Sequence, residues 1–350
     1  MTKVLIAAGG TAGHVVPALA VADALRAEGA DVVFVGGQRA EAELVPAAGY
    51  RLQPIKVSGL SRSNPLKAAR AMAQAVGAVV VAKRILARER PDAVLGGGGY
   101  VAGPVGLAAV LARVPLVLTE ADSHLGLTNR LLARFARRVC LAFPIAGRAA
   151  PLFRVTGRPV PAPSTDRAAA RARFGIPDDA VCVLVFGGSL GARTINVAAV
   201  EGLVGVPYWV LHAAGHRDYA QLRERLGAAP RYVLEPYIQP FGEALVACDL
   251  VVARAGGSIF EVAAHGRPAL LVPYPHAAAD HQTSNAAWMA QAGAAVVVDD
   301  AELDGARLRA AVDGLLGDPA RLRAMAAASA GLARVDAAEA IAGEVLGAAR

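Results

Sequence analysis

One short pattern occurs twice in this 350-residue chain, and it constrains the fold more than any other feature. Residues 4–14 read VLIAAGGTAGH, and residues 181–192 read VCVLVFGGSLGA. In each case an aliphatic run leads into Gly-Gly, a hydroxyl residue and a further glycine, and a helical pattern follows. Such a run, bounded by a glycine turn and a helix, is typical of a buried parallel strand. The chain is therefore predicted to contain two doubly wound α/β domains with parallel sheets.

A proline-rich segment predicts the boundary between the two halves. Residues 157–164 read GRPVPAPS, and because proline fixes φ and lacks a backbone donor, they are expected to form an extended linker. The expected domains are residues 1–157 and residues 164–335, in keeping with a prior of about 150 residues per domain. Residues 336–350 form a last helical stretch that is a candidate to pack back on the first domain.

The composition favours a folded protein with aliphatic cores. Hydrophobic residues make up 55% of the chain and charged residues 19%, which is the opposite of the balance that keeps a chain disordered. Arg113 interrupts the longest apolar segment, residues 104–118, so no segment is expected to supply the roughly 18 apolar residues of a membrane-spanning helix. Wide spacing of the cysteines favours buried thiols in a reducing compartment; they are Cys140, Cys182 and Cys248.

The formal net charge of +7 favours a partner that carries phosphate. Nucleic acid, anionic lipid and nucleotide sugars all meet this description. Nucleic acid is the least favoured of the three, because the sequence has no zinc-finger spacing, no aromatic-rich strand motif and no block of consecutive basic residues. Lipid headgroups and nucleotide sugars remain as the expected partners.

Four glycine-rich loops each follow a predicted strand. A glycine turn between a strand and a helix directs backbone N–H groups and the positive end of the helix dipole at one point, and it lets a ligand approach closely. In doubly wound sheets, ligands bind at the carboxyl ends of the strands, where these loops would gather. Tight turns also use glycine for structural reasons, but four such loops favour a diphosphate site. They are residues 9–13, 96–104, 187–191 and 254–258.

Two common nucleotide-binding motifs are missing from the sequence. There is no GxxxxGK[ST] segment, and residues 9–13 do not fit GxGxxG. The second predicted strand ends in Gly36-Gly37 rather than in the acidic residue that holds a cofactor ribose. A nicotinamide-dependent dehydrogenase is therefore not expected.

Three polar positions are candidates for catalysis or substrate binding, and each has a structural alternative. His14 follows the first glycine loop, where an imidazole is either a general base for a hydroxyl proton or a helix-terminal residue bonded to a nearby loop. Glu261 follows the fourth loop, where a carboxylate either holds the hydroxyls of a ribose or stabilises a helix N-terminus. Residues 280–285, DHQTSN, either hold sugar hydroxyls or cap a helix.

Residues 65–90 are predicted to form a helix with a basic amphipathic surface. Such a surface either rests on anionic lipid or is the solvated side of a helix that faces the core. The apolar residues are Leu66, Met72, Val76, Val79 and Val80, and the basic residues are Lys67, Arg70, Lys83, Arg84 and Arg88.

Taken together, these motifs resemble the MurG family of peripheral membrane N-acetylglucosaminyltransferases, which act in peptidoglycan synthesis. The resemblance covers essentially the whole chain, and it rests on the order and spacing of the motifs rather than on any one of them. They are residues 9–14 (GGTAGH), 98–104 (GGYVAGP), 126–129 (GLTN), 187–192 (GGSLGA), 254–257 (RAGG) with Glu261, and 280–282 (DHQ).

The resemblance implies a fold and a reaction. The fold is the GT-B architecture, in which two Rossmann-like domains face each other across a cleft, with the lipid acceptor on the first domain and the donor mainly on the second. The reaction transfers N-acetylglucosamine from UDP-N-acetylglucosamine to the muramyl sugar of lipid I, undecaprenyl-pyrophosphoryl-MurNAc-pentapeptide. It inverts the linkage, forms lipid II, and requires neither a metal nor another cofactor. The implied location is the cytoplasmic side of the cell membrane, in contact with anionic phospholipid, and no nucleic acid is involved.

The resemblance also implies a role for individual residues. His14 is the first candidate for the general base, and Glu120 is the second. The residues that would contact the donor are Thr11, Ala12 and Gly13 (diphosphate or sugar), Ser189, Gly257 and Ser258 (diphosphate), Ile238 (uracil, through its backbone), Glu261 (ribose) and Gln282 (sugar hydroxyls). A loop for the acceptor or its diphosphate would include Gly98, Gly99, Tyr100 and Asn129.

The chain departs from the family pattern at several places. The family usually has asparagine at the position of Asp122 and arginine at the position of Pro161. Arg158 is a candidate to supply the missing charge, so Asp122 and Arg158 are both expected donor contacts. The loop between Arg254 and Glu261 is one residue shorter than usual.

Two other functions fit the same motifs. A UDP-N-acetylglucosamine 2-epimerase on the same scaffold would release a changed sugar from the donor alone and would need no lipid acceptor. A non-catalytic nucleotide-sugar-binding protein would keep its biological role when His14 and Glu261 are replaced by alanine.

Overall fold

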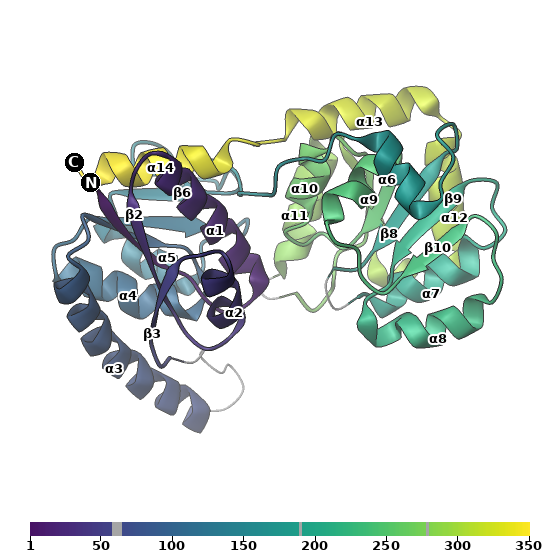
Figure 1. Cartoon of the computed structure of the whole chain (residues 1–350). Coiled ribbons are helices and arrows are strands. Elements are labelled where there is room, and N and C mark those ends of the chain that lie inside the picture. The colour runs from purple at the N-terminus through teal and green to yellow at the C-terminus, as the bar shows by residue number, and fades with distance from the viewer. Residues whose placement is uncertain (58–64, 189–190, 278–279) are drawn as a thin grey trace. The chain divides into compact units, whose positions relative to one another are not determined.

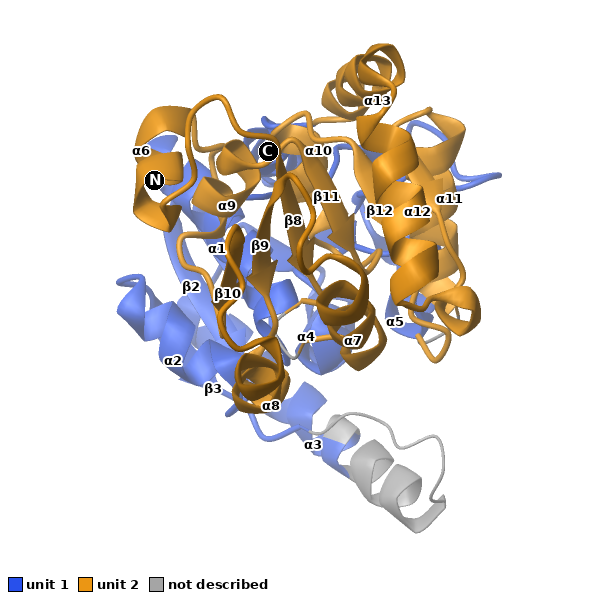
Figure 2. Ribbon diagram, turned by 90° about the vertical axis from the view of Figure 1, so that its right-hand side faces the viewer, with its two compact units in different colours: residues 1–160, 334–350 blue, residues 161–333 orange. Residues whose placement is uncertain are grey.

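The protein is an α/β structure in which helices and strands alternate along the chain (Figure 1). It is a computed structural model, and it divides into two compact units (Figure 2). Residues 1–160 and 334–350 form the first unit, and residues 161–333 form the second. The structure describes residues 1–57, 65–188, 191–277 and 280–350, with the backbone alone at 65–73 and at 75.

The first unit is built on one parallel sheet. Its strands are β1 (Lys3–Ala7), β2 (Asp31–Gly36), β3 (Arg51–Pro54), β4 (Ala93–Gly96), β5 (Leu116–Glu120), β6 (Arg138–Leu141) and β7 (Phe153–Val155). Its helices are α1 (Ala12–Ala27), α2 (Ala40–Ala47), α3 (Pro65–Glu89), α4 (Gly99–Leu111), α5 (Leu127–Leu132), the 3-10 helix η1 (Ala133–Phe135) and α14 (Ala337–Ala348). The strand order is β3-β2-β1-β4-β5-β6-β7, so the direction of winding reverses between β1 and β4. In doubly wound sheets, ligands bind at this reversal, beyond the carboxyl ends of the two strands.

Helices cover both faces of the first sheet (Figure 1). The side chains of β1 show why the strands of this sheet are aliphatic. Val4 and Ile6 pack in a core that includes side chains of α1, α2 and α14. Leu5 and Ala7 face the other way, into a core that includes side chains of α3, α4 and α5. All four are at most 1% exposed. Because successive side chains of a strand point to opposite faces, a strand covered on both faces has to be apolar throughout.

The last helix packs on the first unit although it follows the second in the sequence. Ile341 and Val345 of α14 join the core formed by α1 and β1. Glu344 forms ion pairs with Arg138 of β6 at 2.9 Å and with Arg154 of β7 at 3.3 Å. These contacts fix α14 against the edge half of the sheet as well as against its centre.

The second unit repeats the same design. Its strands are β8 (Cys182–Phe186), β9 (Trp209–Ala213), β10 (Tyr232–Glu235), β11 (Leu250–Ala253), β12 (Ala269–Leu271) and β13 (Ala295–Val297). Its helices are α6 (Arg167–Phe174), α7 (Arg193–Gly202), α8 (His216–Leu226), α9 (Phe241–Ala247), α10 (Ile259–Ala264), α11 (His281–Gln291), η3 (Asp300–Glu302), α12 (Gly305–Leu316) and α13 (Pro319–Gly331). The parallel strands lie in the order β10-β9-β8-β11-β12-β13, with the reversal between β8 and β11. The prediction of two doubly wound, Rossmann-like sheets is thus confirmed.

The core of the second unit is equally aliphatic. Val183 and Val185 of β8 pack with Ile195 of α7 and with Leu308 and Val312 of α12, and none of these residues is exposed.

The three cysteines are buried free thiols. Within the described residues, no helix is both long enough and apolar enough to cross a membrane.

Candidate active site

The loops after β1 and β4 meet at the reversal point of the first sheet. Gly99 has a φ of +75°, and a Cβ there would lie 1.8 Å from the carbonyl oxygen of Gly9. Gly98 has a φ of +96°, and a Cβ there would lie 2.8 Å from Cδ2 of His14. Only glycine therefore allows the loop at residues 97–100 to approach the first glycine loop and its histidine so closely.

His14 lies in the first turn of α1, between these two loops. Its Nδ1 is 3.3 Å from Oγ1 of Thr11, which is the N-cap residue of the helix. Burial lowers the pKa of His14, the charge of Arg158 lowers it further, and Asp122 opposes this shift. The imidazole is therefore neutral near pH 7, as a general base has to be. Nε2 accepts a proton in the tautomer in which Nδ1 carries hydrogen and donates to Thr11.

Arg158 joins this cluster from the segment that follows β7. Its Nη2 donates a hydrogen bond of 2.7 Å to the carbonyl oxygen of Gly13. The structure therefore brings Arg158, Gly13 and His14 together, and Asp122 lies close enough to raise the pKa of His14. Thr11 caps α1 and Ala12 begins it next to them, and both are exposed.

Glu120, the second candidate for the general base, is buried, and its carboxylate is hydrogen-bonded within the protein. It ends β5 and is 7% exposed. Its carboxylate accepts hydrogen bonds from the backbone N–H groups of Asp122 (3.2 Å) and Gly126 (2.8 Å) and from Nδ2 of Asn129 (2.9 Å). Burial raises the pKa of Glu120 in spite of these bonds. Asn129 also donates to the carbonyl oxygen of Thr119 at 2.9 Å, so Glu120 and Asn129 together shape the loop after β5.

Tyr100, in the loop expected to serve the acceptor, uses its hydroxyl within the protein. The hydroxyl donates a 2.8 Å hydrogen bond to Oε1 of Glu41, and burial with this bond raises the pKa of Tyr100 to about 12. Glu41 was not among the residues that the sequence singled out. A glutamate in the first turn of a helix is common at the surface, and nothing in its neighbourhood along the chain predicts that it is buried.

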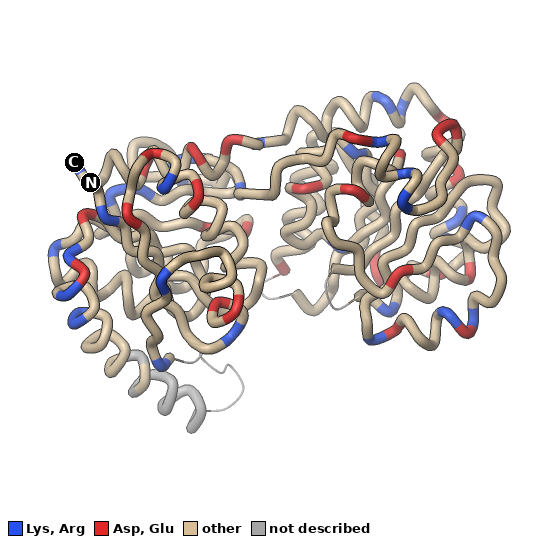
Figure 3. The backbone as a smooth tube through the Cα atoms, in the orientation of Figure 1, with Lys and Arg blue, Asp and Glu red and all other residues tan. Residues whose placement is uncertain are grey.

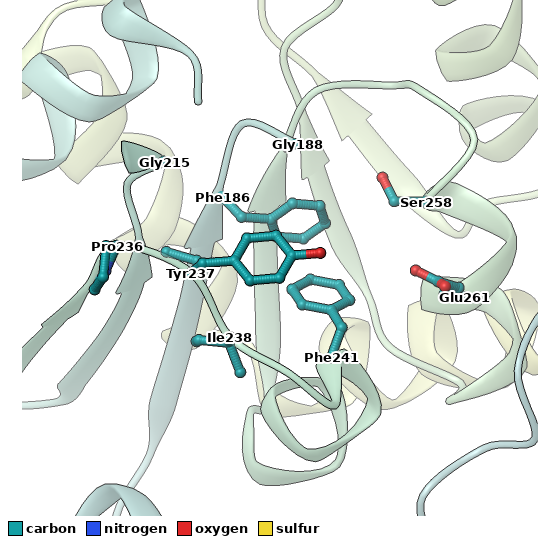
Figure 4. Close-up of a pocket in the computed structure, with 10 residues that line it drawn as sticks. Phe186, Gly188, Gly215, Pro236, Tyr237, Ile238, Phe241, Ser258 and Glu261 are labelled. Carbon is teal, nitrogen blue, oxygen red and sulfur yellow. The ribbon is translucent and has the colours of Figure 1, made fainter. Parts of the chain in front are cut away.

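The second unit contains a pocket at the carboxyl ends of its central strands (Figure 4). The rings of Phe186 and Phe241 meet edge to face, with their centroids 4.8 Å apart, and Tyr237 also lines the pocket. Ser258 and Glu261 line the polar side. The other lining residues are Gly188, Ala213, Gly215, Pro236 and Ile238. The pocket thus combines an aromatic wall with a hydroxyl and a carboxylate, as a nucleoside would require.

Ile238, Ser258 and Glu261 were predicted to bind one ligand, and the structure brings them to this one pocket. Ile238 lines the pocket although it is only 2% exposed. Ser258 precedes α10, and Glu261 lies in the first turn of that helix. Gly257 is adjacent in the chain to Ser258. Ser189 lies outside the residues that the structure describes.

Gln282 lies next to the glycine loop at residues 254–258. Its Nε2 is 3.9 Å from the point that a Cβ of Gly256 would occupy, and its Oε1 accepts a hydrogen bond of 3.0 Å from the N–H of Tyr274. Asn285, in the same helix, donates to the carbonyl oxygen of Ala255 at 3.0 Å. The segment of residues 280–285 therefore fixes the glycine loop and also presents an amide beside it.

Tyr237 and Phe241 are pocket residues that the sequence analysis did not find. Tyr237 is 50% exposed, and its ring stacks on that of His216 with an interplanar angle of 20°. Tyr237 follows β10 and His216 begins α8, so no pattern along the chain connects these two rings. Within the described part of the chain, no three His, Cys, Asp or Glu side chains are grouped as metal ligands would be.

Two family models match the two halves of the chain. The Glycosyltransferase family 28 N-terminal domain matches residues 4–141, which include His14 and the loop at 97–100. The Glycosyltransferase family 28 C-terminal domain matches residues 182–341, which include the pocket. The matched ranges together cover most of the chain.

Solved structures show the same fold. MurG of Acinetobacter baumannii is 30% identical, with a TM-score of 0.82, over 99% of this chain and 100% of that one. A UDP-GlcNAc 2-epimerase from Neisseria meningitidis, bound to UDP-GlcNAc, has a TM-score of 0.71 over 99% of this chain and 100% of that one. It is only 14% identical, so this second likeness concerns the fold alone.

A curated relative is closer in sequence. The UDP-N-acetylglucosamine--N-acetylmuramyl-(pentapeptide) pyrophosphoryl-undecaprenol N-acetylglucosamine transferase of Moorella thermoacetica is 44% identical over 360 aligned positions, 97% of each chain. The alignment covers both domains and the segment between them. With both family 28 domains present and a likeness to such transferases along nearly its whole length, the chain belongs to glycosyltransferase family 28 and, within it, to the MurG family.

Proposed function

We propose that this protein transfers N-acetylglucosamine from UDP-N-acetylglucosamine to the muramyl sugar of lipid I, with inversion, and so forms lipid II. The likeness to the Moorella thermoacetica transferase along nearly the whole chain carries the proposal. The name of that relative states a nucleotide-sugar donor and a lipid-linked N-acetylmuramyl acceptor. The pocket of the second unit has groups suited to the donor. In the first unit, His14 and its neighbours have groups suited to the acceptor.

The pocket of the second unit would hold the uridine diphosphate of the donor. The uracil would lie against the aromatic wall and bond to the backbone of Ile238, and Glu261 would accept hydrogen bonds from the ribose hydroxyls. Gly257 and Ser258 would face the diphosphate, with Ser189. Gln282, beside the glycine loop, would bond to the hydroxyls of the sugar. Backbone N–H groups and hydroxyls that are held in place in this way stabilise the negative charge that develops on the leaving UDP.

His14 would act as general base on the acceptor. The acceptor hydroxyl oxygen bonds to the anomeric carbon of N-acetylglucosamine as the bond from that carbon to the UDP oxygen breaks. Nε2 of His14 takes the hydroxyl proton, and UDP leaves with the electron pair of the broken bond. His14 is favoured over Glu120, because two backbone N–H groups of the following loop and the amide of Asn129 in α5 already occupy the carboxylate of Glu120. Gly98, Gly99 and Asn129 would border the acceptor beside these groups.

The outward side of α3, α4, α5 and η1 would contact the membrane. α4 packs against both α3 and α5, so the exposed side chains of these helices belong to one side of the first unit. Large apolar side chains that are between 38% and 63% exposed lie there: Val76, Val80, Val81, Leu107, Leu111, Leu127, Leu131 and Phe135. Basic residues recur along the described part of α3, at Lys83, Arg84 and Arg88 (Figure 3). The guanidinium of Arg134 in η1 lies 4.8 Å from the ring of Phe135. Exposed apolar groups among cations are what binding to an anionic bilayer requires.

A radiolabel assay tests the function directly. The purified protein is incubated with UDP-[¹⁴C]N-acetylglucosamine, with and without a short-chain lipid I analogue. Label should enter the lipid only when the acceptor is present. Failure of transfer would reject the proposal, and an altered sugar formed from the donor alone would show an epimerase instead.

A further inference from the structure

Glu41 is a buried carboxylate for which the proposed chemistry has no use. It lies in the first turn of α2 and is 0% exposed. A carboxylate is expensive to bury unless hydrogen-bond donors surround it. In contrast, Glu43, two positions further along the same helix, is exposed.

Three donors from three segments converge on Glu41. Oε2 accepts a hydrogen bond of 2.9 Å from the N–H of Gly10. Oε1 accepts one of 2.9 Å from the N–H of Gly37 and one of 2.8 Å from the hydroxyl of Tyr100. These residues follow β1, β2 and β4, which are neighbours in the sheet. Although burial alone would raise the pKa of Glu41, hydrogen bonds led by that from Gly10 lower it overall, so the carboxylate is ionised at neutral pH.

The surrounding backbone leaves just enough room for this carboxylate. A Cβ on Gly9 would lie 2.8 Å from Oε1 of Glu41, and a Cβ on Gly37 would lie 2.9 Å from the same atom. A Cβ on Gly37 would also lie 2.4 Å from the hydroxyl oxygen of Tyr100. Any larger residue at these two positions would therefore displace the carboxylate or the tyrosine.

The carboxylate is connected to the histidine through the two loops that it joins. Gly10 belongs to the loop that leads into His14. Tyr100 lies in the first turn of α4, just after Gly98, where a Cβ would lie 2.8 Å from Cδ2 of His14. A shift of either loop would move His14 relative to Gly98. Because Gly10 and Tyr100 donate to Glu41, that N–H and that hydroxyl serve the protein and not the substrate.

We propose that Glu41 is a positioning residue for sugar transfer, which holds the loops at residues 9–13 and 98–100 in the arrangement that places His14 for proton transfer. The inference rests on the proposed function for its kinetic consequence. It predicts that Glu41 affects transfer without touching either substrate, and that the donor pocket of the second unit does not depend on it.

Glu41→Gln tests the proposal, with Glu43→Gln as its matched control on the same helix. All three partners of Glu41 are donors, and a glutamine amide would direct N–H groups at one or two of them. We expect Glu41→Gln to lower kcat about 10- to 100-fold, the effect of misplacing a catalytic group by an ångström or less. The affinity for UDP, measured by calorimetry, should stay at the wild-type value, and Glu43→Gln should match the wild type in both measurements.

Hydrogen–deuterium exchange gives a readout that does not depend on activity. The amides of Gly10 and Gly37 should exchange faster in Glu41→Gln, whereas peptides of the second unit should be unchanged. If the wild type transfers no sugar, the function proposed above fails, and the exchange experiment still tests the contacts of Glu41. A folded Glu41→Gln protein with wild-type turnover and wild-type exchange at Gly10 would overturn the inference.

Tyr100→Phe covers the case in which Glu41→Gln does not fold. It removes one hydrogen bond and keeps the ring, so the protein should remain folded with a lower kcat and an unchanged affinity for UDP. If both single variants fold, the double variant should be no worse than Glu41→Gln alone, because the two residues belong to one network. Wild-type kcat in Tyr100→Phe, or strictly additive losses in the double variant, would count against the role of Glu41.

Discussion

Arg158 donates a 2.7 Å hydrogen bond to the carbonyl oxygen of Gly13, and its charge thereby lies beside the imidazole of His14. Arg158 and Asp122 act on that imidazole in opposite directions, with Arg158 lowering and Asp122 raising its pKa. Replacing one or the other should therefore raise or lower the pKa of His14, the proposed base.

The pH dependence of transfer should move in opposite directions in two variants. A base acts in its neutral form, so kcat should fall as the pH drops through the pKa of His14, below the usual value of 6.5. Arg158→Gln removes a positive charge, raises this pKa and should move the acidic limb to higher pH. Asp122→Asn should move the limb to lower pH. Profiles of kcat against pH for the three proteins would check this, and limbs that coincide would show that another group titrates.

His14→Ala should lower kcat by about 100-fold or more, because a general base contributes mainly in the transition state. Its affinity for UDP should not change, since the pocket lies in the second unit. Single-turnover measurements with the lipid I analogue would separate chemistry from product release. Turnover close to that of the wild type would remove His14 from the role of base.

Glu261→Ala should weaken the binding of UDP about 10- to 100-fold, which corresponds to the loss of hydrogen bonds to a charged group. The control is Glu302→Ala, an exposed glutamate of the same unit that does not line the pocket. Isothermal calorimetry would measure the affinities for UDP and for uracil alone, and so show whether the lost contact is to the ribose or to the base. An equal loss for uracil would place the defect at the base rather than at the ribose.

Membrane binding should depend on the outward face of α3. Replacing both Val76 and Val80 by glutamate puts two negative charges where the proposal places an anionic bilayer. Sedimentation with phosphatidylglycerol vesicles should then show weaker binding than that of the wild type, whose own binding should fall as salt rises. Val181→Glu with Val204→Glu is the control, because these valines are exposed on the second unit. Equal binding of both double variants would reject this surface.

The sequence predicted the two sheets because burial on both faces leaves a direct mark on it. A strand such as β8, with the sequence CVLVF, has no room for a polar side chain on either face. Gly10 after β1 and Gly188 after β8 are similarly dictated by the local backbone, since their φ angles are +115° and +87°. Features that depend on neighbours in the chain were therefore predictable.

Buried charges were not predictable, because their partners are distant in the sequence. Arg171 of α6 is 1% exposed, and it donates to the carbonyl oxygen of Ala247 and pairs with Asp249. In the sequence it is one of several arginines on a short amphipathic helix. Glu41 is a similar case, since only the meeting of β1, β2 and β4 surrounds it with donors. The aromatic wall of the pocket was missed for the same reason.

The position of α14 has a consequence for how the protein is made. A ribosome synthesises residues 1–160 long before residues 337–348, yet Ile341 and Val345 belong to the core of the first sheet. Until they emerge, one face of that sheet lacks part of its cover, whereas the second unit is continuous and can fold as soon as residue 333 is free. The first unit is thus completed after the second, and His14 stands on a scaffold that α14 completes.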